Sequence, residues 1–185
     1  MRNSTTHPLM INWIPIEGDT GRIGLTLCPG KYQPVSWTGG WDRTLSIDIA
    51  TLVDLETDRI VSLITDEDME LLRVTELPQE IAEQGLVWEH LPFEDTTVPT
   101  RAWLEAAKPV FRLLLTSIPE GENVVVHCMG GLSRAGTFVS IYLWLRGLSM
   151  ADAISRVRKE RSSRAINARQ VDFLQCLEIA GYNVE

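Results

Sequence analysis

One stretch decides the fold: residues 124–137, which read VVVHCMGGLSRAGT. Its β-branched start predicts a buried strand, because valine packs well on a pleated sheet. The adjacent glycines, Gly130 and Gly131, predict a tight loop, and the apolar residues that follow predict a helix. A strand, a short loop and a helix in this order are typical of a parallel sheet covered by helices.

The loop between this strand and this helix has the features of an anion-binding site. Backbone N–H groups of a glycine-containing loop can point inward together, and a helix N-terminus adds a positive dipole end. Cys128 opens the loop and Arg134 closes it, with five residues between them. Nearby positive charge favours the thiolate form of cysteine, and a guanidinium can hold two oxygens of a phosphate or sulfate. The loop therefore pairs a nucleophile with an oxyanion clamp.

A structural role for Cys128 is the alternative, since free cysteines are commonly buried in protein cores. His127 before the cysteine, the glycine pair inside the loop and Arg134 at this spacing favour the functional interpretation. Without these neighbours, the cysteine would be interpreted as a core residue.

Outside the loop, short apolar runs alternate with longer segments of helical periodicity. This pattern predicts an α/β fold, with a central, mainly parallel sheet of about five strands and helices on both faces. The expected strands are 10–14, 22–27, 60–64, 86–91 and 123–126. Helical periodicity lies in 45–55, 67–72, 78–84, 100–117, 135–146, 150–160 and 170–180, which we expect to form five or six helices. Pro109 is expected to kink or split the helix over 100–117.

Length and composition fit one compact domain spanning 1–185, with the motif-bearing core at about 24–181. The chain has 185 residues, of which 44% are hydrophobic and 23% charged, and a chain of this size can bury a sizeable core. It has 17 Lys and Arg against 25 Asp and Glu, a formal net charge of -8. This acidity weighs against a nucleic acid or an anionic membrane as the main partner.

Cysteine usage and the N-terminus bear on location and on metals. The cysteines are Cys28, Cys128 and Cys176, which are far apart and do not have the spacing of a zinc site. We therefore expect no structural metal and no disulfide framework, and a reducing, cytoplasmic location. Residues 1–8 are polar and lack the apolar core of a signal peptide, and the apolar stretch 138–145 is too short to span a bilayer.

The loop from His127 to Arg134 resembles the signature loop of the cysteine-based protein tyrosine phosphatase superfamily. The short chain resembles the small dual-specificity branch of that superfamily, and within it the kinase-associated phosphatases of the cyclin-dependent kinase inhibitor type. The segments 24–30, 128–132 and 165–166 carry this likeness. The resemblance implies the protein tyrosine phosphatase fold. It also implies hydrolysis of phosphotyrosine, phosphoserine or phosphothreonine in proteins through a phosphocysteine intermediate, without a metal or cofactor.

The resemblance further implies a role for each loop residue. Cys128 is expected to be the nucleophile and Arg134 to bind the substrate phosphate. The backbone N–H groups of the residues between them are expected to bind phosphate, sulfate or vanadate oxygens. These residues are Met129, Gly130, Gly131, Leu132 and Ser133. Ala135 is a departure, because the family usually has Ser or Thr after the arginine, and it predicts slow turnover of the intermediate.

Three residues outside the loop complete the expected site. Asp95 matches the family's general acid, in the segment 92–99, with Glu94 as the rival and a solvated turn carboxylate or helix cap as the alternative. His127 is expected to hold the loop by hydrogen bonds rather than to transfer protons. Gln170 is expected to orient the hydrolytic water, although an ordinary first-turn glutamine fits the sequence equally well.

The composition of the loop bears on the substrate. It contains no lysine, unlike the lipid and inositol phosphatases of the superfamily, and this favours a singly phosphorylated protein or peptide as the partner. Two other functions stay open. A phosphoprotein-binding pseudophosphatase would keep the phosphate site and lose turnover through Ala135. A thiol enzyme such as an arsenate reductase or sulfurtransferase would need a second reactive thiol, and nothing in the sequence places Cys28 or Cys176 near Cys128.

Two charged stretches are interpreted as exposed surface. The acidic stretch 54–70 is expected to be a solvated face. The basic cluster is expected to be an exposed helix flank, with docking as the alternative. It consists of Arg156, Arg158, Lys159, Arg161 and Arg164.

Overall fold

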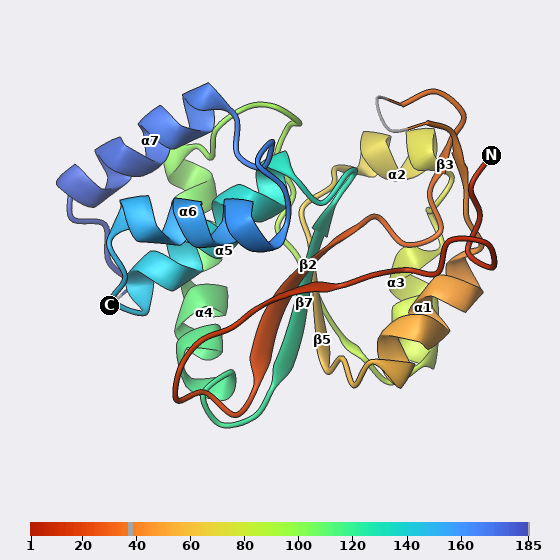
Figure 1. Ribbon diagram of the computed structural model, residues 1–185, viewed down its shortest axis with the longest axis horizontal. Coiled ribbons are helices and arrows are strands. Elements are labelled where there is room, and N and C mark those ends of the chain that lie inside the picture. Colours follow the sequence, from red (N-terminus) through yellow and green to blue (C-terminus); the bar gives the residue numbers. More distant parts are fainter. Residues whose placement is uncertain (37–38, 185) are drawn as a thin grey trace.

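A five-stranded sheet forms the centre of the computed structural model, which describes residues 1–36 and 39–184 (Figure 1). In sheet order the strands are β1 (Asn12–Ile14), β2 (Arg22–Leu27), β7 (Asn123–Cys128), β5 (Arg59–Ser62) and β6 (Val87–His90). The last four are parallel to one another, and β1 runs antiparallel at the edge. The prediction of a mainly parallel sheet is confirmed.

The helices cover both faces of this sheet, as predicted. In Figure 1, α4 to α7 lie on one side of the sheet and α1 to α3 on the other. Their bounds are α1 (Leu45–Asp54), α2 (Asp66–Leu72), α3 (Leu77–Glu83), α4 (Arg101–Ser117), α5 (Ser133–Leu145), α6 (Met150–Glu160) and α7 (Ala168–Ile179). None of the helices in 1–36 and 39–184 combines the length and apolarity needed to cross a membrane.

The central strand accounts for the apolar run at 124–126. β7 pairs with β2 on one side and β5 on the other, so its side chains face helices on both faces. The three valines of β7 are fully buried, as expected for a strand inside a parallel sheet. Because the parallel strands end at one edge, the loops that follow β2, β5, β6 and β7 meet there.

Three differences from the sequence prediction concern whole helices or strands. The helical segments form seven helices in the described residues, rather than five or six. A small antiparallel pair, β3 (Tyr32–Gln33) and β4 (Trp41–Asp42), lies outside the expected strands. α4 is one continuous helix despite Pro109. Pro109 has no N–H to donate to the Glu105 carbonyl one turn earlier, but both residues are exposed, so this carbonyl can accept a hydrogen bond from water.

A buried ion pair attaches α1 to the loop after β2. Arg43 Nε donates to Asp48 Oδ2 at 2.6 Å, and its Nη2 donates to Asp48 Oδ1 at 2.7 Å. The Gly30 N–H also donates to Asp48 Oδ2, at 2.8 Å. Both charged side chains are almost completely buried, so neither can exchange its partner for water.

Replacing Asp48 with Asn should therefore lower the free energy of unfolding by about 3 to 5 kcal/mol, because Arg43 would keep a buried charge without a counterion. Urea unfolding measures the change. The matched control is Glu56→Gln in the exposed Arg22–Glu56 pair, which should cost less than about 1 kcal/mol. Equal effects of the two substitutions would contradict this account of the pair.

Candidate active site

The predicted loop joins the central strand to a buried helix. Cys128 is the last residue of β7, and α5 begins at Ser133. Cys128 is 2% exposed and Arg134 is fully buried. The N-cap residue of α5 is Leu132, whose apolar side chain cannot accept a hydrogen bond from the first N–H groups of the helix.

Cationic side chains hold the outer side of this loop. Lys31 Nζ donates to the Met129 carbonyl at 3.2 Å. Arg161 donates from Nη2 to the Gly130 carbonyl at 3.0 Å and from Nε to the Gly131 carbonyl at 2.9 Å. In a trans peptide unit the N–H points opposite to the carbonyl. The three N–H groups that follow these carbonyls therefore point toward the inside of the loop.

Gly131 is required by the backbone of the loop. Its φ is 64°, a conformation that residues with a side chain rarely adopt. A Cβ atom at this position would lie 2.1 Å from the Thr26 carbonyl oxygen. Gly130 has no such conflict, because a Cβ atom there would have Leu132 Cδ1 as its nearest neighbour, at 3.9 Å.

Within the part of the chain that the structure describes, the Arg134 guanidinium makes all its hydrogen bonds through one nitrogen, and the other two nitrogens make none. Its Nη1 donates to the Leu63 carbonyl at 3.1 Å, the Phe93 carbonyl at 2.9 Å and Asp68 Oδ2 at 2.6 Å. Its Nε and Nη2 are buried and have no hydrogen-bond partner among the described residues. Buried donors are normally paired, and two adjacent guanidinium donors match two oxygens of a phosphate.

Asp95 lies beside Nε of Arg134. Its Oδ1 is 3.2 Å from Arg134 Nε, and 41% of its side chain is exposed. Within the described ranges, the ion pairs of Arg134 are with Asp68 and Asp95, and none is with Glu94. Burial lowers the pKa of Arg134, but the charges of Cys128, Asp68 and Asp95 outweigh burial and raise that pKa.

His127 is buried and neutral at physiological pH. Burial lowers the pKa of His127 to about 3. Its Nε2 lies 2.6 Å from Ser62 Oγ, which also accepts a hydrogen bond from Trp88 Nε1 at 2.8 Å. These contacts fix the end of β7 to β5 and β6, which fits the expected role of holding the loop.

Gln170 reaches the loop from the first turn of α7. Its Nε2 donates to Ser133 Oγ at 2.8 Å and to the Thr97 carbonyl at 2.9 Å. Its Oε1 accepts hydrogen bonds from the Asn167 N–H and from Ser133 Oγ, each at 3.1 Å. The side chain therefore connects α5 to the segment that carries Asp95.

The interpretation of the acidic stretch 54–70 as a solvated face is wrong for Asp68. Its side chain is 14% exposed, and it binds both Arg134 and the Thr65 N–H. The spacing of Thr65 and Asp68 is that of a capping box, which could have marked this helix start in the sequence. The contact with Arg134 joins residues 66 positions apart, and no local pattern marks it.

The interpretation of the basic cluster as an exposed flank is also wrong for two of its members, Arg158 and Arg161. Arg161 holds the loop, and Arg158 donates to the carbonyls of Ala165 and Ile166 at 3.0 and 2.9 Å. Lys159 and Arg164 are exposed as expected.

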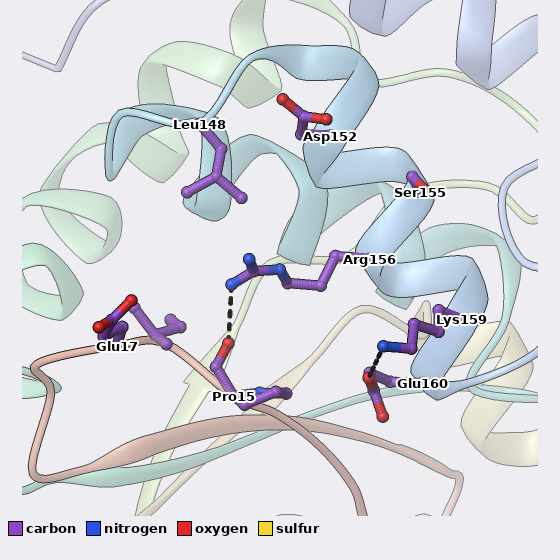
Figure 2. A pocket seen from close by; sticks show the side chains of 9 residues that line it. Pro15, Glu17, Leu148, Asp152, Ser155, Arg156, Lys159 and Glu160 are labelled. Carbon is purple, nitrogen blue, oxygen red and sulfur yellow. Dashed lines mark hydrogen bonds and ion pairs between the residues drawn. The ribbon is translucent and has the colours of Figure 1, made fainter.

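Arg156 lies at a groove that contains none of the predicted site residues. This groove, of about 590 Å³, runs between α6 and the segment after β1 (Figure 2). Arg156 Nη1 donates to the Pro15 carbonyl at 2.9 Å across it. Its walls carry both signs of charge, including Glu17 and Lys159.

Cys28 lies closer to Cys128 than the sequence suggested. Leu27 is the register partner of Cys128, and the Cys28 N–H donates to the Met129 carbonyl at 3.3 Å. Burial raises the pKa of Cys28, so its thiol stays protonated at physiological pH. A protonated, buried thiol is a poor partner for thiol exchange.

Comparisons with known proteins agree with this geometry. A family model described as "Swiss Army Knife protein, DSP-PTPase phosphatase domain" matches residues 38–176. The chain is 36% identical over 100 residues to the PRL-1 phosphatase of Drosophila melanogaster, covering 52% of this chain and 53% of the fly protein. It is 25% identical over 172 residues to the mouse cyclin-dependent kinase inhibitor 3, covering 90% of this chain and 77% of the mouse protein.

A solved structure shares the fold over nearly the whole chain. It is kinase associated phosphatase with a serine in place of the catalytic site cysteine, and it superposes with a TM-score of 0.82 at 22% sequence identity. The match covers 95% of this chain and 98% of that one. The chain spans about half the length of the fly relative. The family match covers most of the chain, including the loop and the Asp95 segment, and the chain therefore belongs to the DSP-PTPase family of dual-specificity phosphatase domains.

Proposed function

We propose that this chain hydrolyses phosphotyrosine, phosphoserine or phosphothreonine in proteins or peptides through a phosphocysteine intermediate. The observation that carries the proposal is the pair of buried Arg134 nitrogens, Nε and Nη2, which make no hydrogen bond to any described residue and lie at the loop opened by Cys128. Asp95 Oδ1 lies 3.2 Å from Nε. A tetrahedral anion in the loop would satisfy both donors and the inward N–H groups. The buried side chains of both sheet faces form one cluster, which supports residues 1–185 acting as one domain.

The first step is transfer of the phosphoryl group to sulfur. The Cys128 thiolate attacks phosphorus in line, and the bond from phosphorus to the side-chain oxygen breaks. Asp95 gives its proton to the departing oxygen, so the substrate leaves as an alcohol or phenol. Arg134 and the loop N–H groups hold the three remaining oxygens as charge shifts onto them.

The second step is hydrolysis of the phosphocysteine. The Asp95 carboxylate takes a proton from a water molecule while the water oxygen attacks phosphorus. The bond between phosphorus and sulfur breaks, inorganic phosphate leaves and the thiolate returns. Asp95 is protonated again, so atoms and protons balance over one cycle.

The charges of the chain support a protein substrate, and its cysteines support a reducing compartment. The net charge of -8 disfavours nucleic acid and anionic membrane partners, and residues 129–133 include no lysine for further phosphates. The three cysteines are free thiols, and Cys176 is exposed, which supports a cytoplasmic location.

A hollow beside Asp95 supports a preference for basic residues next to the phosphorylated one. It measures about 550 Å³, and its lining includes Glu94, directly before Asp95, and Thr97, two residues after it. Buried Phe93 and Trp103 form part of its lining. Its exposed acids are Asp66, Glu67 and Glu94. An apolar surface with an acidic rim suits the aliphatic stem and cationic head of Lys or Arg.

Cys128→Ser should abolish phosphate release from phosphotyrosine and phosphothreonine peptides, because the serine hydroxyl is a far weaker nucleophile. Asp95→Asn should lower kcat/KM by about 100-fold or more, since it removes the proton donor. Glu94→Gln is the matched control and should stay near the wild-type value on peptides without Lys or Arg beside the phosphorylated residue, because the acidic rim of the hollow then has no cation to bind. Full activity of Cys128→Ser, or an equal loss in Glu94→Gln, would contradict these roles. A wild type that binds vanadate without turnover would favour the pseudophosphatase.

Ala135→Ser should accelerate hydrolysis of the phosphocysteine. Ala135 is fully buried, and the nearby Thr137 hydroxyl donates to the Ser133 carbonyl at 3.0 Å, so it is engaged within the helix. Rapid-mixing experiments should show a burst of dephosphorylated product in the wild type and a smaller burst in Ala135→Ser. Thr137→Val should leave the burst unchanged. No gain in the second step for Ala135→Ser would refute this account of slow turnover.

Phosphopeptides with Arg beside the phosphorylated residue should have kcat/KM values about two- to fivefold above those of the same peptides with Glu at that position. This is the effect expected from the free energy of one exposed ion pair. The double variant Asp66→Asn, Glu67→Gln should reduce this difference to the contribution of Glu94. Glu70→Gln, an exposed acid of α2 outside the hollow, should retain it. A preference that is undiminished in the double variant would exclude the hollow as its source.

A further inference from the structure

Two residues with a strained backbone lie close to Asp95 and to the start of α7. Thr96, directly after Asp95, has a φ of 60°, and Ile166 has a φ of 65°. Both are β-branched, and such residues rarely adopt the left-handed region. Strain of this kind persists where surrounding contacts hold it, and it is often found at functional sites.

The side chain of Asn167 links the two strained residues. It follows Ile166 in the chain, and its Nδ2 donates to the Thr96 carbonyl at 3.2 Å. Its Oδ1 accepts a hydrogen bond from the Gln170 N–H at 3.0 Å, which caps α7. The Asn167 side-chain amide therefore serves two purposes, because its oxygen caps α7 and its nitrogen binds the Asp95 segment.

Hydrogen bonds and packing also hold the two residues before Asn167. Arg158 binds the carbonyls of Ala165 and Ile166. The Ile166 side chain packs on Gly136 of α5, where a Cβ atom would lie 2.8 Å from Ile166 Cγ1. The glycine thus lets the segment before α7 approach the helix that carries Arg134.

Gln170 supplies a second link to the same segment. Its Nε2 donates to the Thr97 carbonyl and to Ser133, and its Oε1 accepts from Ser133 and from the Asn167 N–H. These contacts use both amide hydrogens and both acceptor positions of the side chain. Orienting a water would require one of them to break.

We propose that Asn167 and Gln170 form a latch that positions Asp95 for proton transfer. The latch is defined as the two amide donors on the carbonyls of Thr96 and Thr97. It holds the residues after Asp95 against α7 and α5, with Asp95 Oδ1 3.2 Å from Arg134 Nε. Both are positioning residues, and the inference rests on the proposed phosphatase function.

The test removes the donors and keeps the helix cap. Asn167→Asp retains an oxygen for the Gln170 N–H, because aspartate is a good N-cap residue, but it cannot donate to Thr96. Gln170→Glu likewise keeps an acceptor and loses the donor to Thr97. Asn167→Ser keeps a cap without adding a charge near Asp95. Ser149→Ala, which removes the remote cap of α6, is the control for a loss of helix stability alone.

The readout compares substrates that differ in their need for a proton. The constant kcat/KM reports steps up to phosphoryl transfer, so slow hydrolysis of the intermediate does not hide the effect. With phenyl phosphate, whose phenoxide leaving group needs a proton, the kcat/KM of each latch variant should fall about 10- to 100-fold. With 2,4-dinitrophenyl phosphate, whose leaving group needs no proton, the loss should stay below about threefold by the same reasoning. Ser149→Ala should leave the ratio of the two constants unchanged.

A double-mutant cycle separates positioning from general structural damage. In the Asp95→Asn background the latch substitutions should have no further effect on phenyl phosphate, because there is no acid left to position. Equal losses on both substrates, or additive losses with Asp95→Asn, would overturn the latch while the phosphatase function stands. A wild type without turnover would overturn the proposed function, and the latch with it.

Discussion

The buried guanidinium of Arg134 is the constraint on which the site depends. A fully buried charge is costly unless it is paired and hydrogen-bonded. Here the cost is offset at one nitrogen by a carboxylate and two carbonyls, which come from α2 and from the segments after β5 and β6. The position of the arginine therefore depends on three elements that are remote in sequence, and the sheet brings them together at one edge.

The same principle explains how an acidic chain can bind an anion. The positive groups that matter are few, and they are distributed around one loop rather than over a surface. Arg134 lies on the inside, and Lys31 and Arg161 bind the outside through backbone carbonyls. Burial lowers the pKa of Lys31 to about 8, so its charge at the loop is sensitive to mildly alkaline conditions. His127 contributes no charge, because burial keeps its ring neutral.

The parts of the site that could be predicted are those encoded in contiguous residues. The valine run, the glycine pair and the spacing of Cys128 and Arg134 all lie within fourteen positions, 124–137, so strand, loop and helix follow from local patterns. The strand prediction of 60–64 exceeds the observed β5 because Leu63 and Ile64 are buried without belonging to the strand. A run of apolar residues indicates which side chains are buried, and buried residues can extend beyond those that pair in the sheet. The roles of Asp68, Lys31 and Arg161 arise from contacts across the fold, and each of these residues taken alone has the pattern of an ordinary surface charge.

The placement of Cys128 at the end of β7 has a consequence for how the site opens. Core strands of a sheet exchange their amide hydrogens only in large, cooperative opening events, whereas loops held by a few side-chain contacts open locally and at lower free energy. Cys128 belongs to the first kind of unit, because β7 is paired on both sides. The Asp95 segment belongs to the second, because side-chain amides of Asn167 and Gln170 hold it. Cys128 and Asp95 thus lie in regions of different local stability, and the segment of Asp95 can open without unfolding the loop that carries the thiol.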